Sequence, residues 1–290
     1  MLKRNGWMVL LLGISAAVAA AEIRRGTVTV RCDLSARPPG EEARLWLPYP
    51  VSDKEQAITA VKVVGDYAES AVYTDRTHGV PMLFARWAKG APSRKLALSF
   101  SVERREVAAR SLPEREGTWN PADYAPSLGP TRLGPVSGKV KALADEITQG
   151  KNTIPAKARA IYDWVCLHMH RDPKTVGCGA GDVAALLETP GGKCADIHSV
   201  FVALLRAAGI PARETFGLRL GTEDAQDITT WQHCWAEFFL PSYGWVACDP
   251  ADVLKLMLTE RLGASDPKVA AARPALPALP CSGEPGSEWV

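Results

Sequence analysis

Cys194 follows two glycines, Gly191 and Gly192, and stands at the predicted start of a helix. The unpaired amides at a helix N-terminus favour a thiolate, which is the reactive form of cysteine. The glycines would let a substrate approach closely, and the backbone N–H of Cys194 could help to hold an oxyanion. This pattern predicts nucleophilic chemistry at Cys194, which also requires a base, usually a histidine.

Four of the five histidines are weak candidates for that base. His78 falls in a predicted turn between strands, and His168 and His170 lie at the end of a predicted helix, where a cation suits the helix dipole. His198 lies four residues after Cys194 on the same helix face. Two parallel side chains on one helix leave nothing obvious to orient an imidazole, so we expect His198 to have a structural or supporting role.

His233 lies in a predicted β-hairpin whose turn is near Pro241. His233 and Asp249 each lie eight residues from Pro241, so a register centred there places them opposite each other. Opposed side chains of an antiparallel pair lie close enough to meet, and a carboxylate would fix the tautomer of the imidazole. The spacing therefore predicts Cys194 as the nucleophile, His233 as the base and Asp249 as the orienting carboxylate.

Cys234 and Cys248 each lie seven residues from Pro241, so the same register opposes them on the other face of the hairpin. Two interpretations remain open: a cross-strand disulfide that braces the hairpin, or two small residues buried against the core.

The other cysteines give weaker signals. Cys166 and Cys178 flank the end of a predicted helix and form a second candidate pair, whereas Cys32 and Cys281 have no predicted partner. The total of seven is odd, so at least one thiol stays free or pairs with another chain. Because no C-x-x-C or H-x-x-x-H spacing occurs, no zinc site is predicted, and we expect no metal or organic cofactor.

The elements that would position these residues change character along the chain. Short alternating segments with frequent turn formers predict strands over 22–106, and a Pro/Gly-rich stretch predicts a linker over 107–137. Helical periodicity and the hairpin follow over 138–265, and residues 266–290 are Pro-rich and predicted to be disordered. The fold class predicted is α+β: a β-sandwich-like N-terminal domain followed by helices packed on an antiparallel sheet.

Residues 1–21 have the layout of a secretory signal peptide. Lys3 and Arg4 precede an apolar run, and Ala17-Val18-Ala19 fits a cleavage site, although a retained amphipathic anchor is the alternative. Removing this segment reduces the basic residues from 34 to 32, equal to the 32 acidic residues. We expect export to the periplasm or the extracellular space, no nucleic-acid partner, and no membrane association beyond the signal peptide.

Three blocks between about Ala158 and Val253 resemble the transglutaminase-like cysteine enzymes, which have a papain-like core. They are "AIYDWV", "GGKCADIHSVFVALLRAAGIPAR" and "HCWAEFFLPSYGWVACDPAD", and they occur in the order Cys…His…Asp. The resemblance implies the same roles for Cys194, His233 and Asp249. It also implies acyl transfer on a protein or peptide amide through a thioester, which either water or an amine then resolves.

The sequence favours hydrolysis slightly over transamidation, because no lysine tunnel is visible. A catalytically silent domain that binds a protein partner is the alternative from another functional class. A disulfide-stabilised structural protein is a third possibility, but it leaves the predicted pairing of His233 with Asp249 unexplained.

Overall fold

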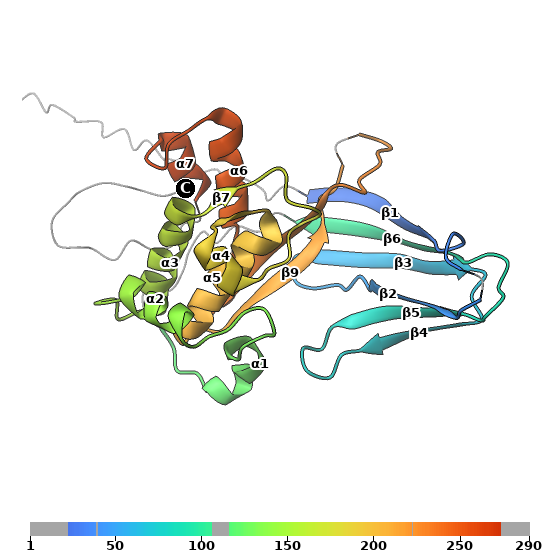
Figure 1. Cartoon of the computed structure of the whole chain (residues 1–290), viewed down its shortest axis with the longest axis horizontal. Coiled ribbons are helices and arrows are strands. Elements are labelled where there is room, and N and C mark those ends of the chain that lie inside the picture. Colours follow the sequence, from blue (N-terminus) through green and yellow to red (C-terminus); the bar gives the residue numbers. More distant parts are fainter. Residues whose placement is uncertain (1–22, 39, 106–115, 222, 274–290) are drawn as a thin grey trace, which may run out of the picture.

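The computed structural model describes residues 23–38, 40–105, 116–221 and 223–273. A β-rich part lies beside a part in which helices pack on a sheet (Figure 1). The predicted signal peptide and Cys281 lie outside the described residues. Within those residues, no helix is both long and apolar enough to cross a lipid bilayer.

The N-terminal part is a β-sandwich of two antiparallel three-stranded sheets, with strand orders β1-β6-β3 and β2-β5-β4. The strands are β1 (Ile23–Asp33), β2 (Ala43–Pro48), β3 (Gln56–Gly65), β4 (Glu69–Thr74), β5 (Pro81–Trp87) and β6 (Lys95–Arg105). Alternating side chains of β6 are buried, as expected for a strand with one face on a core. The β-sandwich-like domain predicted from the sequence is therefore present.

Trp87 anchors the small core of this sandwich. It is 1% exposed and packs among Leu83, Leu96 and Leu98. Its indole N–H donates a hydrogen bond of 2.7 Å to Oδ1 of Asp66. A buried indole N–H needs such a partner, so the apolar core and this polar contact stabilise one arrangement of the two sheets.

The connection to the second part contains two short helical turns, η1 (Pro121–Tyr124) and α1 (Ala125–Leu128). The side chain of Asn120 accepts a hydrogen bond from the backbone N–H of Ala122 and so caps η1. Part of the predicted linker over 107–137 therefore has local structure, because Pro121 and Pro126 can both occupy first-turn positions of a helix.

The second part places helices against the antiparallel sheet β11-β10-β9. Its elements are α2 (Lys139–Ile147), α3 (Ile154–His168), β7 (His170–Arg171), α4 (Val183–Glu188), β8 (Gly191–Gly192), α5 (Cys194–Ala207), β9 (Ala212–Leu218), β10 (Gln232–Leu240), β11 (Gly244–Cys248), α6 (Pro250–Glu260) and α7 (Pro267–Ala272). Helix α5 is central, and Ile197, Phe201, Leu204 and Leu205 on it are completely buried. This apolar stripe fixes which way the N-terminus of α5 faces.

The register predicted for the hairpin is wrong by two residues. The turn is centred on Ser242, which has φ = +68°, and Leu240 pairs with Gly244. Cys248 therefore pairs with Ala236. A shift of two residues leaves each side chain on the same face, so His233 and Asp249 stay neighbours, now diagonally.

The proposed bridge between Cys234 and Cys248 is corrected by the same shift. The two residues are not opposed, and both are buried free thiols. Of the two interpretations left open by the sequence, the structure favours small residues that fill the core.

The segment predicted to be disordered from residue 266 contains helix α7. Val269 on this helix is completely buried, and Nη1 of Arg273 lies 3.1 Å from Oδ1 of Asp163 on α3. The composition of the tail predicts disorder, but a buried apolar residue and an ion pair help to dock this short stretch on the core.

Candidate active site

Cys194 is the first residue of α5, as predicted. It is 4% exposed, and its backbone N–H has no acceptor within the helix because of its position in the first turn. The carboxylate of Asp196 accepts a hydrogen bond of 3.1 Å from the N–H of Lys193, which fixes the entry into the helix. A free N–H therefore lies directly beside the thiol.

The structure brings together the predicted histidine and carboxylate. Nε2 of His233 lies 2.6 Å from Oδ2 of Asp249. Asp249 is also the N-cap of α6, and its Oδ1 accepts a hydrogen bond of 2.9 Å from the N–H of Asp252. Asp followed by Pro is a typical helix start. The sequence therefore also indicates the N-cap role of Asp249, which the hairpin spacing by itself does not.

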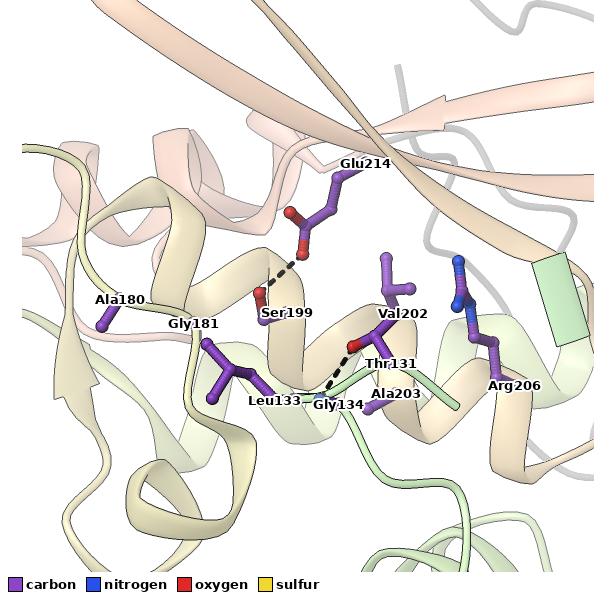
Figure 2. A pocket seen from close by; sticks show the side chains of 10 residues that line it. All are labelled: Thr131, Leu133, Gly134, Ala180, Gly181, Ser199, Val202, Ala203, Arg206 and Glu214. Atoms are coloured by element: carbon purple, nitrogen blue, oxygen red, sulfur yellow. Dashed lines mark hydrogen bonds between the residues drawn. The ribbon is translucent and has the colours of Figure 1, made fainter. Parts of the chain in front are cut away.

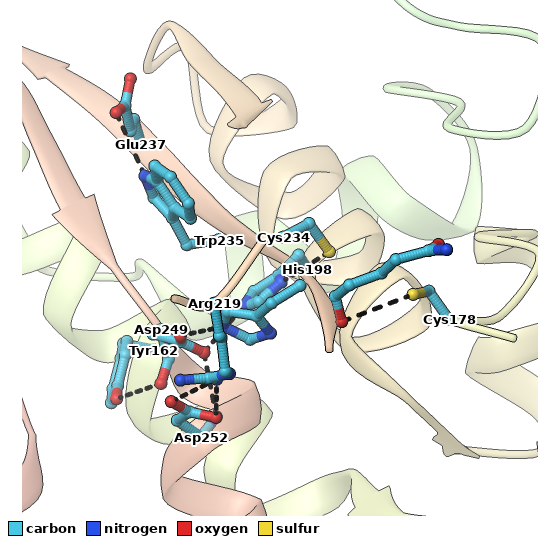
Figure 3. Close-up of polar contacts among 11 residues, drawn as sticks. Tyr162, Cys178, His198, Arg219, Cys234, Trp235, Glu237, Asp249 and Asp252 are labelled. Atoms are coloured by element: carbon cyan, nitrogen blue, oxygen red, sulfur yellow. Dashed lines mark hydrogen bonds and ion pairs between the residues drawn. The ribbon is translucent and has the colours of Figure 1, made fainter. Parts of the chain in front are cut away.

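His198 contacts the other oxygen of the same carboxylate, and Figure 3 labels both His198 and Asp249. Its Nε2 lies 3.2 Å from Oδ1 of Asp249, and its Nδ1 lies 3.4 Å from Sγ of Cys234. The ring is completely buried. The supporting role expected for His198 agrees with this position, but the expectation that nothing orients its ring is wrong, because the orienting groups come from β10 and from the start of α6.

The thiol of Cys194 is strongly acidified. A hydrogen bond with the Cys234 thiol is the largest influence; burial opposes it, and a hydrogen bond with His233 adds to it. Together they lower the pKa of Cys194 to about 3. The pKa of Cys234 is raised, first by the same contact with Cys194 and then by burial. Cys194 is therefore the thiolate and Cys234 the neutral donor.

His233 is the cation that matches this thiolate. Burial disfavours its charge, but hydrogen bonds to Asp249 and Cys194 outweigh burial and raise its pKa to about 9. Burial likewise opposes the charge on Asp249, yet the hydrogen bonds from His198 and His233 hold the pKa of this carboxyl well below its usual range. A thiolate–imidazolium pair is therefore the stable form between about pH 3 and pH 9.

Cys178 also contacts Cys194, which sequence reasoning missed. Its thiol is within hydrogen-bonding reach of the Cys194 sulfur, and its carbonyl accepts a hydrogen bond of 3.0 Å from the N–H of Ala195. The suggested pairing of Cys178 with Cys166 is not present: both thiols are free, and Cys166 is buried in the core under α3.

His233, Asp249 and Asp252 are the group of described residues whose ligand atoms lie close enough together, within 4.8 Å, to hold a metal ion. Nη2 of Arg219 already lies 2.6 Å from both carboxylate oxygens of Asp252, and Asp249 accepts bonds from two imidazoles. The charges of these carboxylates are thus engaged by protein groups, and the chemistry that the cluster supports is proton transfer.

A cavity of about 240 Å³ lies beside α5, next to the loop that carries Cys178 (Figure 2). Gly181, Ser199, Arg206 and Glu214 are among its lining residues, and Ser199 Oγ donates a hydrogen bond of 2.6 Å to Glu214. Burial raises the pKa of Glu214, and the nearby Cys194 charge acts in the same direction. The wall of the cavity therefore contains a buried carboxyl group that Ser199 holds in place.

Comparisons with known proteins identify a family and several relatives. The model of the transglutaminase-like superfamily matches residues 141–250, a range that contains Cys194, His233 and Asp249. An uncharacterized protein of Haemophilus influenzae is 36% identical over 251 residues, which cover 78% of this chain and 68% of that protein. A protein-glutamine gamma-glutamyltransferase of Pseudomonas aeruginosa is 30% identical over 174 residues, which cover 54% of this chain and 25% of that protein.

A solved structure of a candidate cysteine protease from Cytophaga hutchinsonii shares the fold. Its TM-score is 0.57 at 16% identity, and the match covers 80% of this chain and 78% of the other. The fold expected from the sequence, a β-sandwich followed by a papain-like core, is thus confirmed. This chain belongs to the transglutaminase-like superfamily.

Proposed function

We propose that this chain is an exported thiol-dependent acyl-transfer enzyme that acts on protein or peptide amides. The observation that carries the proposal is the contact of Cys194, at the start of α5, with His233, whose Nε2 lies 2.6 Å from Asp249. Cys194 would be the nucleophile, His233 the general acid and base, and Asp249 the residue that orients His233. Export rests on the layout of residues 1–21.

Acylation follows from the charges of the site. The Cys194 thiolate attacks the carbonyl carbon of the amide, and the free N–H of Cys194 donates to the oxyanion that forms. Because Nε2 of His233 is engaged by Asp249, Nδ1 is the nitrogen that can face the thiolate and give its proton to the leaving amine. The C–N bond breaks, and a thioester remains on Cys194.

Deacylation uses the same imidazole in its neutral form. Nδ1 removes a proton from the incoming nucleophile, which attacks the thioester carbonyl and releases Cys194. Water gives hydrolysis and a primary amine gives transamidation, and we propose hydrolysis as the main reaction. The gamma-glutamyltransferase relative supports an amide substrate, although the match spans only a quarter of that protein.

The test is an amide assay with three readouts on one substrate. Purified protein is incubated with a glutamine-rich unfolded protein and a fluorescent primary amine, and peptide cleavage, ammonia release and amine incorporation are measured together. We expect turnover that Cys194→Ala abolishes and that Cys32→Ser leaves unchanged, because Cys32 lies in β1 of the sandwich. Cleavage or ammonia release without amine incorporation would identify hydrolysis.

Absence of turnover on amides, with a fast-alkylating Cys194, would contradict the proposal. It would favour the alternative function, a silent domain that binds a protein partner. Equal turnover in Cys194→Ala would likewise remove Cys194 from the mechanism.

A further inference from the structure

The chemistry proposed above leaves one neighbour of the nucleophile without a role. Cys178 places its thiol within hydrogen-bonding reach of Cys194. The Sγ of Cys178, which Figure 3 labels, also lies 4.0 Å from the carbonyl oxygen of Gln232. The backbones are also adjacent, because the N–H of Ala195 donates to the carbonyl of Cys178 at 3.0 Å. This backbone contact and the proximity of the two thiols bring the cysteines within the reach that a disulfide requires.

The loop around Cys178 is built to hold this position. Gly177, Gly179 and Gly181 have φ values of +61°, +103° and +68°, which other residues rarely adopt. Oδ1 of Asp196 accepts a hydrogen bond of 2.9 Å from the N–H of Gly181, and a Cβ at Gly179 would collide with the same carboxylate. The buried Asp196 thus connects the loop to the first turn of α5 and fixes Cys178 over the nucleophile.

The two thiols differ in charge and in access. Burial, followed by the nearby charge of Cys194, raises the pKa of Cys178, which therefore stays protonated beside a thiolate. Cys178 is half-buried on a loop, whereas Cys234, the other neighbour, is 1% exposed in the middle sheet strand and bonded to His198. A neutral, partly exposed thiol next to an oxidisable thiolate is the arrangement of a resolving cysteine.

We propose that Cys178 and Cys194 form a reversible disulfide when a hydroperoxide oxidises the nucleophile. The proposal rests on the thiolate assigned to Cys194 in the proposed function. In the first step the Cys194 thiolate attacks one peroxide oxygen, so the S–O bond of a sulfenic acid forms, the O–O bond breaks, and the other oxygen leaves as hydroxide or alkoxide. In the second step the Cys178 sulfur attacks the Cys194 sulfur; its proton and the sulfenic hydroxyl leave as water, and the S–S bond forms.

The disulfide would stop amide chemistry and also protect Cys194. A sulfenic acid without a resolving thiol continues to sulfinic and sulfonic acids, which dithiols do not reduce. A dithiol reductant exchanges with the disulfide, returns two electrons and restores the free Cys194. Cys178 would therefore convert an irreversible loss into a reversible one.

The test compares the wild type, Cys178→Ser and Cys32→Ser after exposure to hydrogen peroxide. Remaining thiols are blocked without reductant, and linked peptides are mapped by mass spectrometry. We expect a peptide pair that joins Cys178 to Cys194 in the wild type and in Cys32→Ser. A second sample is treated with dithiothreitol, and the alkylation of Cys194 by iodoacetamide is measured; we expect recovery in both of these proteins and loss in Cys178→Ser.

Three results would overturn the proposal: a bridge between Cys194 and Cys234, equal recovery with and without Cys178, or a Cys194 that peroxide does not oxidise. The readouts are thiol chemistry and need no turnover. If the amide assay fails while the Cys178–Cys194 bridge forms, the proposed function is wrong and the disulfide stands. If turnover is present and no bridge forms, the disulfide alone is wrong.

Discussion

The sandwich and the papain-like core both bury polar groups, but they satisfy them differently. In the sandwich, the buried guanidinium of Arg94 donates to the carbonyl oxygens of Pro38 and Glu41 at 3.2 and 2.7 Å. Asp66, which accepts from the indole of Trp87, also accepts a backbone N–H from Lys95 at 2.7 Å. The guanidinium contacts end on backbone carbonyl groups, which do not titrate, and the Asp66 carboxylate is held by an indole and a backbone N–H, so these contacts stabilise the structure.

In the papain-like core the polar contacts form a closed ring of side chains. Cys194 contacts His233, His233 and His198 share Asp249, His198 contacts Cys234, and Cys234 contacts Cys194. Each member of this ring, Cys194–His233–Asp249–His198–Cys234, is ionisable. A proton lost by one member changes the hydrogen bonds of the next, so this ring favours reactivity, whereas the polar contacts of the sandwich only brace its two sheets.

The largest effect should come from opening the ring at its carboxylate. Asn caps helices as well as Asp does, so Asp249→Asn should keep α6, but the amide can accept on only one atom and so leaves one imidazole without its acceptor. We expect kcat on the amide substrate to fall by about 10³–10⁴ with little change in Tm. Asp182→Asn, at the N-cap of α4, is the matched control and should retain full activity. A near-normal rate in Asp249→Asn would show that the ring is passive.

A smaller effect should follow from removing the neutral donor of the ring. Cys234→Ala deletes the hydrogen bond that contributes most to the low pKa of Cys194. A hydrogen bond to a charged group is worth about 1.5–3 kcal/mol, so the pKa of Cys194 should rise by roughly 1–2 units. Because the thiolate exists only above its pKa, the alkylation midpoint should move to higher pH by that amount. Cys248→Ala, also buried but outside the ring, should leave the midpoint in place; an equal shift in both variants would refute the assignment.

The smallest effect should come from the sandwich. Trp87→Phe removes the hydrogen bond to Asp66 and part of a buried side chain, and should lower the free energy of unfolding by about 1–2 kcal/mol. The rate of Cys194 alkylation should not change, since no contact of Trp87 reaches the ring among the described residues. Denaturant unfolding and iodoacetamide kinetics on the same sample measure both quantities. If Trp87→Phe lowered both the alkylation rate of Cys194 and the free energy of unfolding, the packing of the sandwich would be coupled to the site in the papain-like core.

Much of the site follows from local pattern. The apolar stripe of α5 and the glycines before it predict where Cys194 lies, and alternation in β10 predicts which residues share a face with His233. The prediction that His233 and Asp249 are neighbours holds despite the error of two residues in the hairpin register. A shift by an even number of residues leaves each side chain on the same face of the sheet. The predicted disulfide between Cys234 and Cys248 does not hold, because a cross-strand disulfide requires the two residues to lie directly opposite each other.

Periodicity and spacing along the chain thus predicted the α+β class and the candidate set of Cys194, His233 and Asp249, since the start of one helix and the faces of one hairpin can be recognised locally. Tertiary structure alone decided the rest of the site. His198 reaches Asp249 across 51 residues, and Cys178 reaches Cys194 through a glycine loop that packs on Asp196. Such contacts depend on how α5 packs against β10 and α6. The periods of 2 and 3.6 residues show which face of a strand or helix is buried, but they do not show which element it packs against.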